Sequence, residues 1–225
     1  HHDQDIRNMG GLRKHMPVTW LTALLGSLAL IGTPLFAGFY SKDSIILAVE
    51  ASNLPGTPFA IFAVVAGVFV TAFYSFRMYF LVFHGEERFH HKPHPTEDDH
   101  AHDSHDDHHD ATPQESPWVV TAPLILLAVP SVVIGYLAIQ PMLFGEFLKD
   151  AIVVDAARHP AMTVLAEGFH GAAAMALHGL QTPPFWLALA GVVTAWWFYL
   201  KQPAIPAAIA RSLGPVVRVL EMVRR

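Results

Sequence analysis

Four long stretches of the chain contain no Asp, Glu, Lys or Arg, and this feature constrains the fold more than any other. The stretches cover residues 17–41, 51–76, 116–145 and 168–200 of a 225-residue chain. A helix needs about 20 apolar residues to cross the hydrocarbon core of a bilayer, and each stretch is longer than that. The pattern therefore predicts an all-α polytopic membrane protein and argues against a water-soluble globular enzyme.

The few charged residues are unevenly distributed. They make up 15% of the chain, against about 25% in soluble domains. Ten of the 19 acidic residues lie within 86–115, and nine of the 15 histidines lie within 84–109. The net charge of −5 and the lack of a basic stripe exclude a nucleic-acid partner. The absence of cysteine excludes disulfides, thiolate zinc sites and cysteine-ligated clusters in this chain.

The apolar runs predict about four transmembrane helices, the first of them broken, each beginning near a proline. We expect helices a and b within 18–84, helix c at 117–140 and helix d at 184–200. The remaining segments are a loop at 1–17, a His/Asp-rich loop at 85–116, a connection at 141–183 and the start of an amphipathic lateral helix at 201–225.

The distribution of basic residues predicts the orientation. If the four spans alternate, ten Lys and Arg residues fall on one side and only Lys149 and Arg158 fall on the other. The positive-inside rule then places both ends and the His/Asp-rich loop in the cytoplasm, and the 141–183 connection outside.

Two further segments have an amphipathic rather than a spanning pattern. Residues 149–180 predict short helices on the outer face. In 204–225, Arg211, Arg218 and Arg225 recur every seven residues, which predicts a helix in the membrane interface. The alternative for this second segment is a simple basic tail that stops transfer.

The first span carries a break, in LALIGTPLFAGFYSKDSIILAVE. Pro34 removes the hydrogen bond to the carbonyl of Leu30, and in a membrane that carbonyl needs another helix, a hydroxyl or water. Thr33 is placed to help, and Ser41 follows the break. Broken helices at membrane depth are typical of ion pathways.

Lys42 and Asp43 lie just after this break. A lysine inside the bilayer costs about 2.5–3.5 kcal/mol on insertion scales, so such residues usually have a function. We expect Lys42 to carry a proton, with Asp43 tuning it or acting as the next acceptor. The two are about 100° apart around a helix and need not form a tight ion pair. The alternative is a Lys-Asp pair that reaches the outer interface.

Arg77 and His84 lie toward the other end of helix b. Arg77 is expected to extend its side chain to the inner interface. His84 lies one heptad later and is either a proton uptake group near the cytoplasm or an ordinary loop histidine.

The His/Asp-rich loop has almost no apolar residues, so we expect a disordered, solvated linker that could also buffer protons. It lacks the ligand spacing of a structural zinc site. Weak, nonspecific metal binding is expected at five loop histidines: His100, His102, His105, His108 and His109.

Three stretches make a family resemblance clear: HHDQDIRNMGGLRKHMP, LIGTPLFAGFYSKDSIILA and TAFYSFRMYFLVFHGEER. They resemble the antiporter-like subunit L of respiratory complex I, the proton-pumping NADH:quinone oxidoreductase, known in mitochondria as NADH dehydrogenase subunit 5. By this resemblance the chain is the C-terminal part of a longer subunit, from the broken twelfth helix to the start of the lateral helix. Lys42 then corresponds to the lysine near the proton exit, and Asp43 to its acidic neighbour.

The resemblance also implies a setting. The partners are other membrane subunits of complex I, the lipid bilayer and protons. The location is the bacterial inner membrane, or the mitochondrial inner membrane if the source is eukaryotic. The complex carries FMN, iron–sulfur clusters and quinone, and this chain carries no cofactor. The long His/Asp-rich loop departs from the family pattern and favours a bacterial source. The alternatives are a related sodium/proton antiporter subunit and a metal-ion transporter with a His-rich loop.

Overall fold

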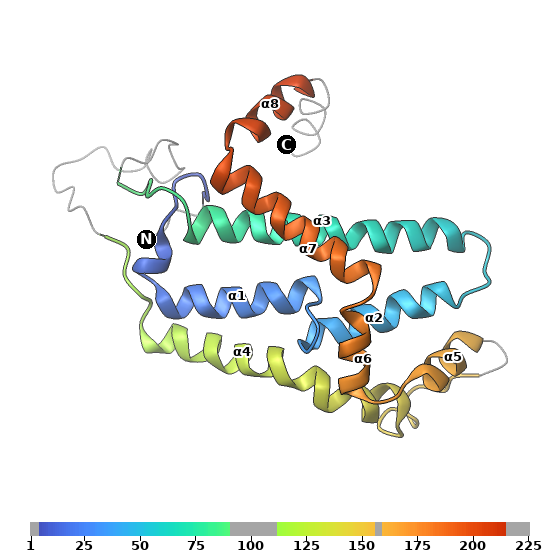
Figure 1. Ribbon diagram of the computed structural model, residues 1–225. Coiled ribbons are helices and arrows are strands. Elements are labelled where there is room, and N and C mark those ends of the chain that lie inside the picture. Colours follow the sequence, from blue (N-terminus) through green and yellow to red (C-terminus); the bar gives the residue numbers. More distant parts are fainter. Residues whose placement is uncertain (1–4, 91–111, 156–158, 215–225) are drawn as a thin grey trace.

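A computed structural model describes residues 5–90, 112–155 and 159–214 (Figure 1). Within these ranges every regular element is a helix, which confirms the all-α prediction. The five loop histidines expected to bind metal weakly lie outside the described residues, as do Arg218 and Arg225 of the basic tail.

Three helices are long and apolar enough to cross a membrane. Helix α3 covers Thr57–Phe83. Helix α4 covers Trp118–Ile139 and continues into a π-helical turn, Gln140–Phe144. Helix α7 covers Pro183–Trp196 and continues into a second π-helical turn, Trp197–Lys201. They occupy the segments where the sequence predicted helices b, c and d.

The predicted first span is two helices, α1 (Pro17–Ile31) and α2 (Ala37–Glu50). Figure 1 shows them following one another in the same direction, with a loop between them. Helix α1 is apolar but has only 15 residues, which is shorter than the roughly 20 residues that a complete span needs. The predicted break is therefore present, and it separates a whole apolar helix from the segment that carries Lys42.

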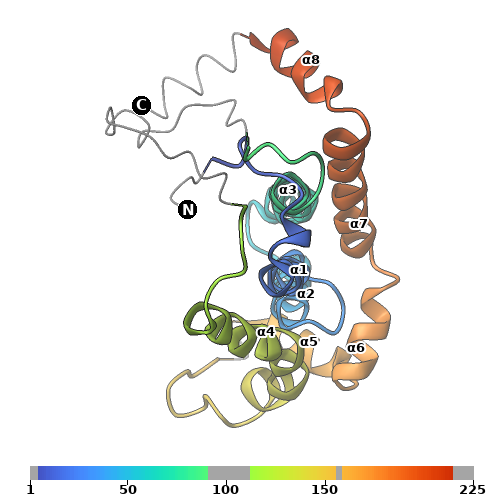
Figure 2. The same cartoon turned by 90° about the vertical axis from the view of Figure 1, so that its left-hand side faces the viewer.

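The helices pack around the broken pair. Figure 2 views α1 and α3 nearly end-on, with α7 against α3 and α4 against α1 on the other side. Small residues let α7 approach α3 closely, since Ala188, Gly191 and Ala195 recur along its α3-facing side. A Cβ on Gly191 would lie 2.7 Å from the carbonyl oxygen of Phe69, the close backbone contact typical of membrane helices.

Two short helices, α5 (Pro160–Gly168) and α6 (Ala172–Gly179), follow α4. Both lie beside α2: α6 packs next to the start of α2, near the break, and α5 lies farther along, toward the end of the bundle where α2 leads into α3 (Figure 1). The prediction of short helices in this connection is thereby confirmed. After α7, helix α8 (Ala204–Ser212) begins the predicted amphipathic segment.

The opposite end of the bundle holds what we call the N-terminal cluster, in which residues 8–20 meet residues 84–88. The Gly11 amide donates to the His84 carbonyl oxygen at 3.3 Å. The Arg88 Nε donates to the Met9 carbonyl oxygen at 2.9 Å. Lys14 and Glu87 form an ion pair at 3.3 Å. These contacts fasten the N-terminal segment to the end of α3.

Candidate functional site

The break between α1 and α2 is built by local backbone geometry. Gly32 ends α1 in the left-handed region, with φ 80°. Its amide donates to the Ala29 carbonyl oxygen at 3.2 Å, and the Thr33 amide donates to that of Leu28 at 3.1 Å. This pair of bonds is the Schellman arrangement, for which glycine is the favoured residue. Leu35 also has a positive φ, 78°, which is uncommon for a residue with a side chain.

Lys42 satisfies a carbonyl that the break leaves free. Its Nζ donates a hydrogen bond to the Leu30 carbonyl oxygen, the group that Pro34 was predicted to deprive of a partner. The Thr33 hydroxyl was expected to help, but the donor to this carbonyl is Lys42. The ammonium lies at the C-terminal end of α1, where the helix dipole favours a positive charge.

Two glycines make room for this contact. A Cβ on Gly38 would lie 1.8 Å from the Ala29 carbonyl oxygen, so the first turn of α2 packs directly on the last turns of α1. A Cβ on Gly32 would lie 3.2 Å from Cδ of Lys42. A larger residue at position 32 would therefore crowd the Lys42 side chain.

Asp43 is buried, with 7% of its surface exposed. Among the described residues its carboxylate accepts no hydrogen bond and forms no ion pair with Lys42. Asp43 and Lys42 nevertheless line the same narrow pocket of about 20 Å³, beside Gly32 and Val68. A buried carboxylate without a protein partner is costly unless water solvates it or a proton neutralises it.

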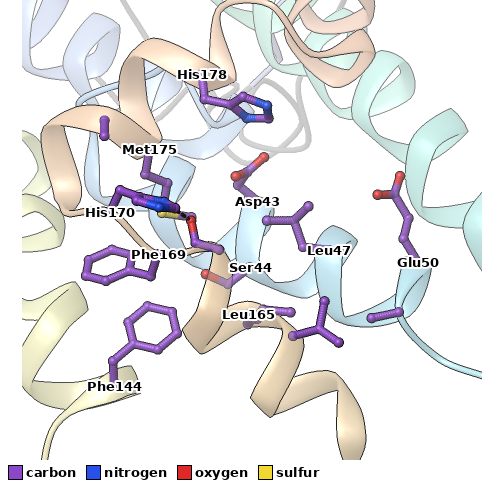
Figure 3. Close-up of a pocket in the computed structure, with 14 residues that line it drawn as sticks. Asp43, Ser44, Leu47, Glu50, Phe144, Leu165, Phe169, His170, Met175 and His178 are labelled. Atoms are coloured by element: carbon purple, nitrogen blue, oxygen red, sulfur yellow. Dashed lines mark hydrogen bonds between the residues drawn. The ribbon is translucent and has the colours of Figure 1, made fainter.

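A larger cavity of about 560 Å³ opens on the other side of Asp43, and we call it the α2–α6 cavity. Figure 3 shows its walls: the Asp43 carboxylate and the His178 ring face one another at one end, and Glu50 lies farther along α2. Asp43 interacts electrostatically with both His178 and Glu50. His170 also lines the cavity. These three polar neighbours were not predicted as site residues.

The other predicted residues do not join this site. The Ser41 hydroxyl is exposed and donates to the Gly38 carbonyl oxygen at 3.3 Å. Arg77 donates from Nε to the Tyr199 hydroxyl at 3.1 Å, and its guanidinium carbon lies 5.3 Å from the centre of that ring. Arg77 therefore links α3 to the π-helical turn that continues α7. The sequence did not predict Tyr199 as its partner, because it does not show that these helices pack together.

His84 directly follows α3, in the N-terminal cluster. The Trp20 Nε1 donates to its Nε2 at 3.3 Å, so we assign the ring proton to Nδ1. Burial first, and then the positive charge of Arg13, lower the pKa of His84 below 6.5. The imidazole is therefore neutral at pH 7 and accepts a hydrogen bond, whereas its role in proton uptake stays a prediction.

The comparisons with known proteins agree on one family. Residues 1–73 match the family model described as NADH:quinone oxidoreductase/Mrp antiporter, TM. The chain is 58% identical to NADH-quinone oxidoreductase subunit L of Neisseria meningitidis, over 98% of this chain and 33% of that protein. The chain belongs to the NADH-quinone oxidoreductase subunit L family. The resemblance inferred from the three sequence stretches is thereby confirmed.

More distant members of the subunit L family match almost as much of the chain. NAD(P)H-quinone oxidoreductase chain 5 of Picosynechococcus is 38% identical over 97% of this chain and 31% of its own length. Subunit L of Rhodobacter capsulatus is 32% identical over 98% of this chain and 37% of its own length. The chain thus spans about one third of the length of these relatives. The family model's match includes α1, α2, Lys42 and Asp43, so this membrane protein carries its candidate site within the family's shared region.

Proposed function

We propose that this chain takes part in proton translocation coupled to electron transfer, as part of a membrane-arm subunit of NADH:quinone oxidoreductase. The observation that carries the proposal is the broken helix, where the Lys42 ammonium rests on the Leu30 carbonyl beside the buried Asp43 carboxylate. Intramembrane ionisable groups at a helix break are typical of proton pathways. The setting is the bacterial inner membrane, or the mitochondrial one for a eukaryotic source.

The geometry suggests how a proton passes between the two side chains. As neighbours on a helix they are about 100° apart, but both line the narrow pocket of about 20 Å³. A space of about 10–15 Å³ is enough to hold one water. In the proposed step, the Lys42 ammonium gives a proton to this water while the water gives one to the Asp43 carboxylate. A neutral amine and a carboxylic acid result, so charge is conserved.

Lys42 is suited to this exchange because, among the described residues, its ammonium has a backbone carbonyl as its acceptor and no carboxylate as an ion-pair partner. One backbone carbonyl accepts from the ammonium, and the helix end favours the charged form. The neutral amine keeps less of that attraction, so its side chain is free to reorient toward a new proton source. The redox energy must come from the rest of the complex, where flavin, iron–sulfur clusters and quinone reside. Other membrane subunits and lipid would cover the exposed apolar faces of the helices.

The test uses the full-length subunit in the assembled complex. Lys42→Met keeps the length of the side chain and removes the ionisable group, so the complex should assemble but pump several-fold fewer protons per electron, with slower coupled turnover. Lys149→Met is the matched control, because Lys149 is exposed and its one partner among the described residues is Glu146, at 2.7 Å. A normal proton-to-electron ratio in Lys42→Met would overturn the proposal.

Sodium/proton exchange is a second candidate, because the description of the family model names Mrp antiporters beside quinone oxidoreductases. The same broken helix would serve either ion. Replacing sodium by potassium during NADH-driven pumping separates the two functions. Proton pumping that is independent of sodium supports the first proposal, whereas transport that requires sodium supports the second.

A further inference from the structure

The α2–α6 cavity contains more ionisable groups than the proposed Lys42–Asp43 exchange uses. Its wall includes Glu50 from α2, His170 from the turn between α5 and α6, and His178 from α6. A proton that reaches Asp43 must still leave the protein, since Asp43 is itself buried. The cavity is the only described space of this size that Asp43 lines, so the next proton acceptor should lie on its wall.

His178 is held in place over α2 rather than lying on a freely moving surface turn. The next residue, Gly179, packs so closely on the Phe39 ring that an added Cβ would lie 2.4 Å from two of its carbons. At the other end of α6, the Tyr40 hydroxyl donates to the Ala172 carbonyl oxygen at 3.4 Å. Phe39 and Tyr40 flank α6 within one buried cluster. They lie on the same turn of α2 as Lys42 and Asp43, three residues before each of them. One contact surface therefore sets the position of His178 relative to the site.

The space between Asp43 and His178 suits water. The two groups face each other (Figure 3) and interact electrostatically, but they form no ion pair within 4 Å. A bulk water occupies about 30 Å³, so a cavity of about 560 Å³ has room for a chain of waters. Asp43 is buried and His178 is exposed. A proton that passes from Asp43 to His178 would therefore move from a buried group to the protein surface.

We propose that His178 accepts the proton from Asp43 through water in the α2–α6 cavity and releases it to the aqueous phase beside α6. The inference rests on the proposed function. In the step, the Asp43 carboxylic acid gives its proton to a water, that water gives one to a ring nitrogen of His178, and the imidazolium then loses its other proton to bulk water. Histidine is suited to this role because its charge changes between pH 5 and 8.

The other two groups are less suited to receive this proton. His178 and Glu50 interact electrostatically with Asp43, whereas His170 is not among these neighbours. The His170 Nδ1 donates to the Gly168 carbonyl oxygen at 2.9 Å, which holds the ring beside the turn before α6. Glu50 lies at the far end of α2 and is exposed. His170 is therefore the matched control for His178, since it is a histidine on the same cavity wall.

The experiment measures NADH-driven proton pumping in sealed membrane vesicles that contain the complete complex. His178→Gln should lower the proton-to-electron ratio at least two-fold, and His178→Glu should restore more than half of the loss, because glutamate can also bind and release a proton. His170→Gln should pump normally. His178 is exposed on α6, so glutamine at this position leaves no hole in the core.

The results distinguish a failure of this inference from a failure of the proposed function. Lys42→Met measured in parallel tests the proposed function alone. If Lys42→Met loses pumping and His178→Gln keeps it, the inference about His178 is wrong and the proposed function stands. An equal defect in His178→Gln and His178→Glu would indicate a structural role and overturn the inference, as would an equal defect in His170→Gln. If Lys42→Met pumps normally, both fail.

Discussion

The charged and polar side chains at the two ends of the bundle differ in whether they have protein partners. In the N-terminal cluster, Arg88 donates to the Met9 carbonyl oxygen, Lys14 pairs with Glu87, and His84 accepts from Trp20. In the α2–α6 cavity, Asp43 accepts no hydrogen bond from any described residue and faces His178 across open space. Groups with fixed partners fasten the chain, whereas groups that face a cavity remain free to exchange protons.

Lys42 lies between these two extremes. Its ammonium has one backbone acceptor, at the end of α1, so it has a resting position without a permanent counter-ion. The carbonyl exists as a free acceptor only because the helix breaks there. The same break therefore creates both the resting position of the lysine and the pocket that it shares with Asp43.

The largest expected structural effect is at the α1–α2 contact. Gly38→Ala places a Cβ 1.8 Å from the Ala29 carbonyl oxygen, and overpacking of this kind costs about 1–3 kcal/mol. Because backbone atoms must move, we expect the Lys42 contact to be lost together with most of the assembled complex. The measurement is the yield of complex and its thermal inactivation in membranes.

Gly26→Ala is the control for that substitution. Nothing lies within 4 Å of the added Cβ at this position in α1, and alanine is favoured over glycine inside helices by about 1 kcal/mol. We expect normal or slightly improved stability. Equal losses in Gly26→Ala and Gly38→Ala would show that the close contact at the break is not what holds the two half-helices together.

The sequence predicted the features that depend on neighbouring residues, and it missed those that depend on contacts between residues farther apart in the chain. The spans followed from uninterrupted apolar runs, and the break followed from Gly32 and Pro34. The free Leu30 carbonyl was also identified, but its donor was expected to be the nearby Thr33. The actual donor, Lys42, depends on how the chain turns after the break, and local patterns do not specify that turn.

The sequence did not predict the α2–α6 cavity. His170 and His178 are exposed, and no pattern in the sequence relates either of them to Asp43. Their relation to Asp43 arises only because Gly179 packs on Phe39, a contact between distant parts of the chain. Helix periodicity predicts which residues share a face of one helix. It does not predict which helices meet, so the partner of Arg77 on α7 was missed for the same reason.

A smaller effect is expected at the start of α1, where Glu115 acts as a cap. Its Oε2 accepts from the Val18 and Thr19 amides at 2.7 and 3.2 Å, and its Oε1 accepts from the Thr19 hydroxyl at 2.6 Å. Glu115→Gln should cost about 1 kcal/mol, the usual contribution of a helix cap. Thermal inactivation should therefore shift to a lower temperature, with the proton-to-electron ratio unchanged.

The same cap predicts a pH dependence. Burial of Glu115 tends to raise its pKa, but the hydrogen bonds from Thr19, Val18 and Ser116 outweigh it, so the pKa is lower than 4.5. The folded state then binds fewer protons than the unfolded state, and the stabilisation is present above pH 4.5 and lost as the pH falls below it. In Glu115→Gln this acid-sensitive part should disappear. An unchanged acid response would contradict the capping role.

The smallest effect is expected at the exposed ion pair of the N-terminal cluster. The hydrogen bond from Lys14 lowers the pKa of Glu87 below 4.5, but both side chains contact water, and exposed pairs contribute little to stability. Glu87→Gln should shift thermal inactivation less than Glu115→Gln and leave pumping unchanged. A pumping defect in Glu87→Gln would contradict the view that the charged groups of the N-terminal cluster serve only to hold the chain in place.

The central claim is that the lysine at the helix break moves protons, and the proton-to-electron ratio of Lys42→Met tests it most directly. The measurement compares NADH oxidation with proton uptake in the same sealed vesicles that hold the intact complex. The account predicts an assembled complex with a ratio several-fold below that of Lys149→Met. A ratio equal to that of Lys149→Met, in a complex assembled to the same level, would contradict it.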